Sequence, residues 1–111
     1  MSIPKIIIGR VGYYPKGYTP IRCDRNTNSV FKNPFGGKNK PLNGREDACN
    51  QFSAYFSEKM MNRTSNLRIA VRRLLRRLQK GENICLQCHC LPLRCHTETI
   101  KQYLEKEIAN G

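Results

Sequence analysis

A dense cluster of side chains that could do chemistry lies near the end of the chain. The twelve residues "CLQCHCLPLRCH", from Cys85 to His96, contain four of the six cysteines and both histidines. Thiolate and imidazole groups serve as metal ligands, nucleophiles and acid–base catalysts. This stretch is therefore the first candidate for a functional site.

Three interpretations of the cluster compete. The first is a tetrahedral zinc centre, whose ligands would be Cys88, Cys90, Cys95 and His96. The ligand types suit zinc, but the spacing departs from the usual C-x2-C knuckle. In the second interpretation Cys95 is a nucleophile, with His96 or His89 as acid or base. In the third, the thiols are buried and backbone groups satisfy the histidine.

The hydrophobic pattern predicts the elements that hold this cluster. The β-branched run "PKIIIGR" (4–10) is typical of a buried strand, and "NICLQC" (83–88) indicates a second one. Helical periodicity indicates three further segments, at 43–62, at 66–79 and within 95–108, where Thr97 is a possible cap. We therefore expect residues 1–111 to form one domain of the α/β class, a small Rossmann-like parallel or mixed sheet with about three helices.

The predicted strands place the cluster at one edge of the sheet. Strands joined through helices run parallel, and ligands bind outside their carboxyl ends, here Arg10 and Cys88. Side chains alternate between the two faces of a strand, so Cys88 and Cys90 share one face and Cys85 points to the other. We therefore expect Cys85 in the core. Cys95 and His96 precede the last helix, whose N-terminus lowers a thiol pKa and disfavours imidazolium.

Residues 11–44 are rich in Gly, Pro, Asn and Lys. A structureless connection of this length is uncommon, so it should have a function or contain a short hairpin near 28–31. Because two strands make a poor sheet, we expect a further strand or two within it. Tyr13 and Tyr14, close to Lys16, are candidates for stacking on nucleic-acid bases.

The charge of the chain favours polyanionic partners. Twenty Lys and Arg residues against eight Asp and Glu give a formal net charge of +12. One predicted helix bears a stripe of six cations, namely Arg68, Arg72, Arg73, Arg76, Arg77 and Lys80. They repel one another at helical spacing with no acidic residue between them. We interpret the stripe as a phosphate-binding face, the alternative being a solvated helix surface.

Several short motifs resemble a small uncharacterised domain family of phages and bacteria. They are the early strand "IIIGR", the tripeptide "NPF" at 33–35, Arg45, and the terminal pattern L-x-C-x-C-x-P-x-x-C-H, which spans 86–96 here. The chain is also similar to a second α/β group with a terminal C-H-R turn, which implies a pocket at that turn. Thr97 replaces the arginine here, so Arg94 becomes the candidate for an anion contact.

These patterns predict a phage-type protein that binds a nucleotide or nucleic acid, with a Cys95 thiolate as the candidate for any catalysis. The pocket would be formed by Arg10, Asn33, Phe35, Arg45, Cys88, Cys90, Arg94, Cys95 and His96. One alternative is a zinc-stabilised interaction module, and another is a factor that grips an acidic host protein through its arginine-rich helix. No apolar run is long enough to span a membrane, so we expect a cytoplasmic protein without a membrane partner.

Overall fold

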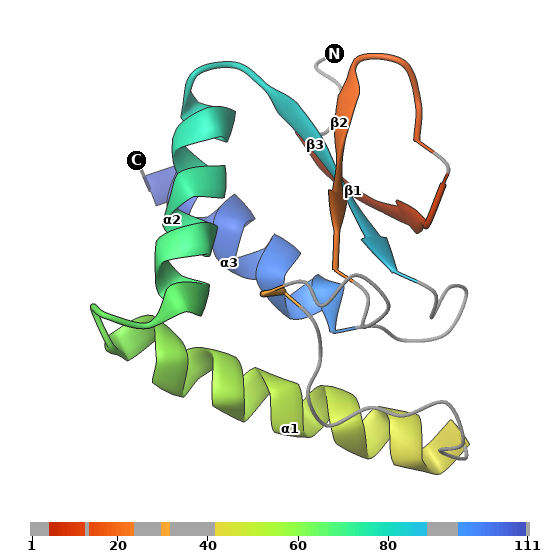
Figure 1. The fold of residues 1–111 in the computed structure, drawn as a ribbon, viewed down its shortest axis with the longest axis vertical. Helices are drawn as coiled ribbons and strands as arrows, with labels where there is room; N and C mark the ends of the chain where they lie inside the picture. Colours follow the sequence, from red (N-terminus) through yellow and green to blue (C-terminus); the bar gives the residue numbers. More distant parts are fainter. Residues whose placement is uncertain (1–4, 13, 24–29, 32–41, 89–95, 111) are drawn as a thin grey trace.

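Parallel strands and helices make up the fold, as expected for the α/β class. The computed structural model describes residues 5–12, 14–23, 30–31, 42–88 and 96–110, and for 42–48 the backbone alone. In chain order the elements are β1 (Ile6–Arg10), β2 (Tyr18–Arg22), α1 (Leu42–Met61), α2 (Asn66–Gln79), β3 (Asn83–Cys88) and α3 (Thr97–Asn110). Figure 1 shows α1 lying across one end of the molecule, with α2 and the sheet rising from it.

The sheet has the strand order β1-β3-β2, and both neighbours run parallel to β3. As the middle strand, β3 is buried from Ile84 to Cys88, which explains why its sequence is apolar without alternation. The extra strand expected within 11–44 is β2, and it lies earlier than 28–31, of which only 30–31 is described. Pro20 is tolerated in β2 because this strand is at an edge of the sheet.

The link between β1 and β2 is unusually short for two parallel strands. Such connections commonly need a dozen or more residues, whereas this one consists of residues 11–17 and passes from one side of β3 to the other. Gly12 and Gly17, near its two ends, have φ values of 86° and 93°. A Cβ at either position would meet nothing within 4 Å, so the backbone conformation is the reason for glycine.

Helix α2 has matching signals at both ends. At its start the Ser65 hydroxyl accepts a hydrogen bond from the backbone N–H of Arg68, at 3.4 Å. At its end Gly81 has a φ of 106°, and the N–H groups of Gly81 and Glu82 donate to the carbonyls of Leu78 and Arg77. This is a Schellman motif, and it explains why the predicted bounds of α2 are confirmed.

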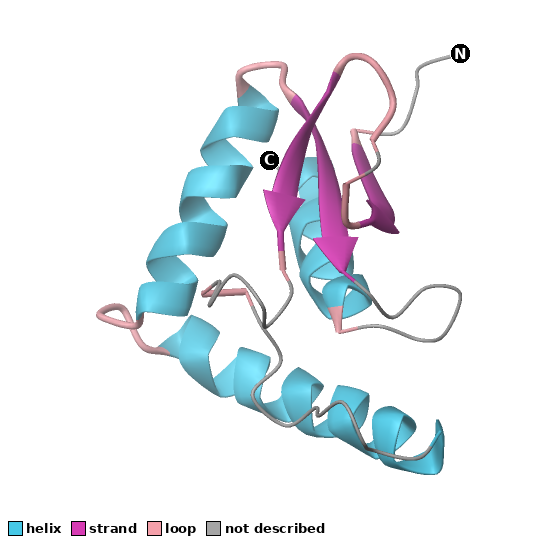
Figure 2. Ribbon diagram, turned by 45° about the vertical axis from the view of Figure 1, so that its right-hand side comes forward, coloured by secondary structure: helices cyan, strands magenta, loops and turns pink. Residues whose placement is uncertain are grey.

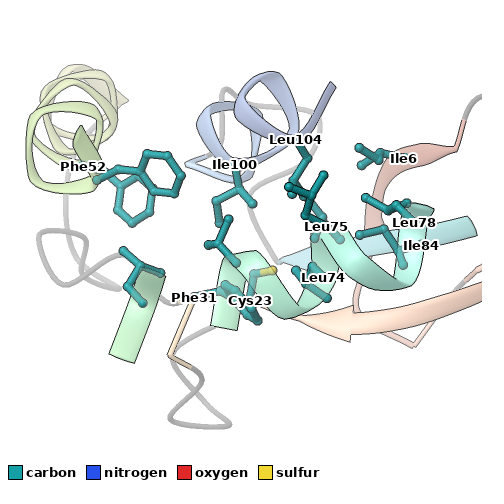
Figure 3. Close-up of a cluster of buried hydrophobic side chains, with 14 residues drawn as sticks. Ile6, Cys23, Phe31, Phe52, Leu74, Leu75, Leu78, Ile84, Ile100 and Leu104 are labelled. Atoms are coloured by element: carbon teal, nitrogen blue, oxygen red, sulfur yellow. The ribbon is translucent and has the colours of Figure 1, made fainter. Parts of the chain in front are cut away.

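All three helices contribute to one apolar cluster with the sheet. Figure 3 shows it running from Phe52 of α1 to Ile6 and Ile84 of the strands. On α1, Cys49, Phe52 and Phe56 are buried, and their i, i+3, i+7 spacing puts them on one face of the helix. Helix α2 contributes five buried side chains, Leu67, Val71, Leu74, Leu75 and Leu78. The cluster thus holds α2 rigidly by one side.

Candidate functional site

The carboxyl ends of the three strands meet at one edge of the sheet, as the sequence predicted for β1 and β3. Arg10 is the register partner of Cys88, and Arg22 is that of Gln87. Just beyond β2, the N–H of Cys23 donates to the carbonyl of Gln87 at 2.8 Å. We call this region the sheet edge, defined by Arg10, Arg22, Cys23, Gln87, Cys88, His96 and Thr97.

Arg22 is the sheet-edge residue that sequence reasoning missed. It ends β2, a strand of five residues with Pro20 in its middle, and proline normally argues against a strand. The available signal was the alternation of "YTPIR" between glycine- and asparagine-rich segments. Because β2 pairs with β3 rather than with a sequence neighbour, no local pattern places Arg22 beside Gln87.

His96 is a buried clamp between distant parts of the chain. Its Nε2 lies 3.0 Å from the carbonyl oxygen of Cys23 and 2.7 Å from that of Phe31. Carbonyl oxygens only accept, so Nε2 carries the proton and donates to both. The ring also meets Phe52 edge-on, with centroids 4.9 Å apart. His96 therefore holds the chain after β2 against the start of α3 and against α1.

The surroundings of His96 favour its neutral form. Burial lowers the pKa of His96 below its ordinary value of 6.5, and the hydrogen bonds to the carbonyls of Phe31 and Cys23 offset part of this effect. The direction agrees with the predicted neutral imidazole, but the main cause is burial rather than the helix N-terminus. A general base or zinc ligand at this position would have to use Nδ1, because Nε2 is engaged.

The described cysteines are buried. Cys85 is fully inaccessible, which confirms its predicted place in the core, and burial raises the pKa of its thiol above the ordinary 9.0. Cys23 and Cys49 are buried as well, and neither is in a disulfide. Cys88 is disulfide-bonded. A disulfide sulfur is not a thiolate, so Cys88 could bind zinc only after reduction.

Metal binding finds no further support within the described part of the chain. There, no three Cys, His, Asp or Glu side chains are grouped so that they could hold a metal ion. The other two predicted cysteine ligands, Cys90 and Cys95, lie outside the described residues. The zinc site thus stays a prediction.

Thr97 has an unusual hydroxyl group. The residue is the first of α3 and is fully buried, and its Oγ1 has no hydrogen-bond partner. A buried hydroxyl without a partner costs free energy, so the position is not optimised for stability alone.

Seven other predicted site residues lie outside the described ranges. They are Tyr13, His89, Cys90, Asn33, Phe35, Arg94 and Cys95. Arg45 lies in α1, but its side chain is not described. Tyr14 and Lys16 are exposed in the link between β1 and β2.

The cations of α2 form a second candidate site, on the surface. We define the arginine face as Arg68, Arg72, Arg73, Arg76 and Lys80. Arg68 is half-buried and the other four are exposed. Among the described residues, no ion pair or hydrogen bond engages the side chains of these five. Arg77 differs, because its guanidinium binds Glu82 with a shortest N–O distance of 2.9 Å.

The arginine face is separated cleanly from the apolar side of α2. Five buried residues point into the core and no acidic residue occurs in the helix. Figures 1 and 2 both show α2 along one side of the molecule, and in Figure 1 the C-terminal end of α3 passes behind it. The cations are therefore presented to solvent on a rigid support.

Comparison with known proteins identifies the family. The family model described as Domain of unknown function (DUF4326) matches residues 6–106. The chain belongs to this family. The result confirms the resemblance to an uncharacterised small domain family that the motifs indicated. No curated protein and no solved structure matches the chain significantly.

The DUF4326 match extends from β1 into α3. Both candidate sites, the sheet edge and the arginine face, therefore lie inside the region that defines the family. No described helix is long and apolar enough to cross a membrane.

Proposed function

We propose that this protein binds nucleic acid through the arginine face of α2. The observation behind this proposal is the set of outward cations that have no ion-pair partner among the described residues. Like charges at i, i+4 spacing destabilise a helix slightly, and a bound anionic partner would reduce this repulsion. Guanidinium groups also suit phosphate, because they donate two parallel hydrogen bonds.

The spacing of the cations fits a polyanion better than a single anion. Arg68, Arg72, Arg76 and Lys80 follow one another at i+4 intervals, a row about 18 Å long at 1.5 Å per residue. A duplex presents one phosphate per about 3.4 Å on each strand, so several phosphates lie within reach of such a row. The net charge of +12 adds long-range attraction to the same partner.

Binding to a fluorescently labelled oligonucleotide over a series of salt concentrations tests the proposal. If the face contacts about four phosphates, the slope of log K against log salt should be about −3 to −4. The variant R72Q/R76Q should make this slope shallower by about 1 for the loss of Arg72, and by about 2 where Arg76 also contacts a phosphate, since each lost phosphate contact contributes about 0.9. Two cations are removed from α2 in this variant.

The matched control removes two cations from α3 instead. K101Q/K106Q changes the net charge by the same amount, and its cations lie outside the arginine face. Equal effects of the two variants would show that overall charge, not the face, causes binding. Undetectable binding at about 50 mM salt would refute the proposal and favour an acidic protein partner.

A second candidate function is binding of a nucleotide or a nucleic-acid end at the sheet edge. It is supported by Arg10 and Arg22, which end the two strands beside β3 near the N-terminus of α3, a favourable place for phosphate. In this proposal Cys95 is the thiolate for any catalysis. Calorimetric titration with a nucleoside triphosphate should show binding that R22Q weakens, and C95S should abolish turnover but keep binding. Unchanged affinity in R22Q would refute it.

A further inference from the structure

The exposed side of α2 has two flanks and a centre. At about 100° per residue, Arg72 and Arg73 point about 100° apart around the helix. Arg68 lies on the flank of Arg72, and Lys80 lies nearer that of Arg73. Ile69 and Arg76 project between the two flanks, roughly opposite the buried leucines. Cations therefore border the exposed surface on both sides instead of forming a single line.

Ile69 is unexpected at the centre of this surface. Its side chain is 40% exposed, and it is not part of the apolar cluster that holds α2. A solvated cationic surface gains nothing from an isoleucine in its middle. An apolar side chain between flanking cations suits a grooved partner whose two sides are negatively charged and whose base is less polar.

The major groove of B-form DNA has this character. Its two walls are phosphate backbones, and its floor presents base edges that include the thymine methyl group. The groove is about 12 Å wide and admits a helix, whose diameter with side chains is about 10–12 Å. Arginine in the centre, as at Arg76, can donate two hydrogen bonds to guanine.

The position of α2 permits this mode of binding. Figures 1 and 2 show it along one side of the molecule, and α1 meets its N-terminal end steeply after a link of residues 62–65. Five buried side chains fix α2 from behind, so that it would enter a groove without reordering. Helix α2 contains no aromatic residue on which unpaired bases could stack.

We infer that α2 is a groove-binding helix for double-stranded DNA, with Ile69 and Arg76 facing the bases and Arg68, Arg72, Arg73 and Lys80 facing the phosphates. The inference rests on the proposed function and specifies its ligand. Single strands lack the groove, and the major groove of an RNA duplex is too deep and narrow for side chains to read.

The first test compares one sequence as a DNA duplex, an RNA duplex and a single DNA strand. The DNA duplex should bind at least about ten-fold more tightly than the other two, equivalent to about 1.4 kcal/mol. Equal affinity for DNA and RNA duplexes, or tighter binding to the single strand, would overturn the inference but leave nucleic-acid binding in place. Failure to bind all three would overturn the proposed function itself.

The second test uses a substitution that changes no charge. Ile69→Ala should weaken binding to a duplex selected from a random library by about five-fold, because it removes three carbons from contact with bases. Val30→Ala is the matched control, since Val30 is 41% exposed and lies outside α2. An Ile69→Ala protein that binds like the wild type would show that α2 contacts phosphates alone and would overturn the inference.

Discussion

The arginine face and the sheet edge use charged and polar groups in opposite ways. At the sheet edge, His96 donates to two backbone carbonyls, and Cys88 is bonded to another cysteine. On the arginine face, cations stand in solvent with no described partner. His96 and Cys88, which are of reactive types, thus hold parts of the chain together, while the cations of the arginine face are exposed and accessible to a partner. Reactive residue types are a poor guide to function until their contacts are known.

The comparison also separates the causes of stability from the causes of binding. Substitutions of the buried residues at the sheet edge, such as His96 and Thr97, should change the free energy of unfolding. Substitutions on the arginine face should leave this free energy nearly unchanged and alter nucleic-acid affinity instead. Five predictions test this division, beginning with the largest expected effect.

Replacement of His96 by alanine should cost about 3 kcal/mol of unfolding free energy. The substitution leaves a cavity beside Phe52 and removes the donor from the carbonyls of Cys23 and Phe31. Urea denaturation measures the loss. His96→Gln, which restores an N–H donor, should recover part of it. A loss below about 1 kcal/mol would show that the clamp is not a main support of the fold.

Lowering the pH should destabilise the protein through the same residue. Because the pKa of His96 is lowered in the folded state, the unfolded chain binds the proton more readily, and stability is lost as the pH falls below 6.5. Denaturation at about pH 7.5 and about pH 5.5 should show a smaller decrease for His96→Gln than for the wild type. An identical decrease in both proteins would exclude His96 as a cause.

Thr97→Val should raise the unfolding free energy by about 1 kcal/mol. Valine keeps the shape of threonine and removes a buried hydroxyl that has no hydrogen-bond partner. Thermal denaturation would detect the change as a higher Tm. A lower Tm would mean that the hydroxyl has a stabilising partner in solution, which would make the sheet edge a better candidate for ligand binding.

R72Q/R76Q should stabilise the free protein by about 0.5 kcal/mol while it weakens nucleic-acid binding. The substitutions relieve repulsion at i, i+4 spacing on an exposed helix surface. Arg77→Gln is the control within α2, and it should be slightly destabilising because it removes the ion pair with Glu82. Destabilisation by R72Q/R76Q would indicate that these arginines have stabilising contacts in the folded protein.

Because Cys88 is in a disulfide, treatment with a chelator should leave the stability of the protein unchanged. Elemental analysis of the purified protein should then find no zinc, and a chelator should leave the Tm unchanged. About one zinc per chain, together with unfolding in chelator, would instead establish the zinc-stabilised module. The sheet edge would then differ from the arginine face in holding a metal rather than a disulfide.

Most of the fold could be predicted because its signals are local. The leucines of α2 recur at helical spacing between a serine cap and Gly81, and the predicted bounds of α2 and β3 agree with the structure. The β-branched run of β1 and the apolar run of β3 likewise predicted parallel strands. Burial was predicted correctly for β3 alone, because β1 lies at an edge of the sheet and only its Ile6 is buried. For the candidate site, the predicted meeting of Arg10 and Cys88 at one edge follows from this strand direction alone.

Other features depend on contacts between residues far apart in the chain. Strand β2 is short, contains proline, and exists because β3 offers it an unpaired edge. Arg22 consequently reaches the sheet edge without any local signal. For His96 the sequence left three roles open: acid or base, zinc ligand, and a buried side chain satisfied by the backbone. Its hydrogen bonds to the carbonyls of Cys23 and Phe31 agree with the third role and span 73 and 65 positions of sequence.

The amino-acid sequence by itself determined the helices, two of the three strands, the family and the cationic side of α2, because each of these follows from composition, order or short-range periodicity. Only the tertiary structure decided which polar groups form hydrogen bonds inside the protein and which remain exposed to solvent. Burial and hydrogen bonding are properties of the neighbours that folding brings together, and they turned His96 inward while leaving Arg72, Arg73 and Arg76 in solvent.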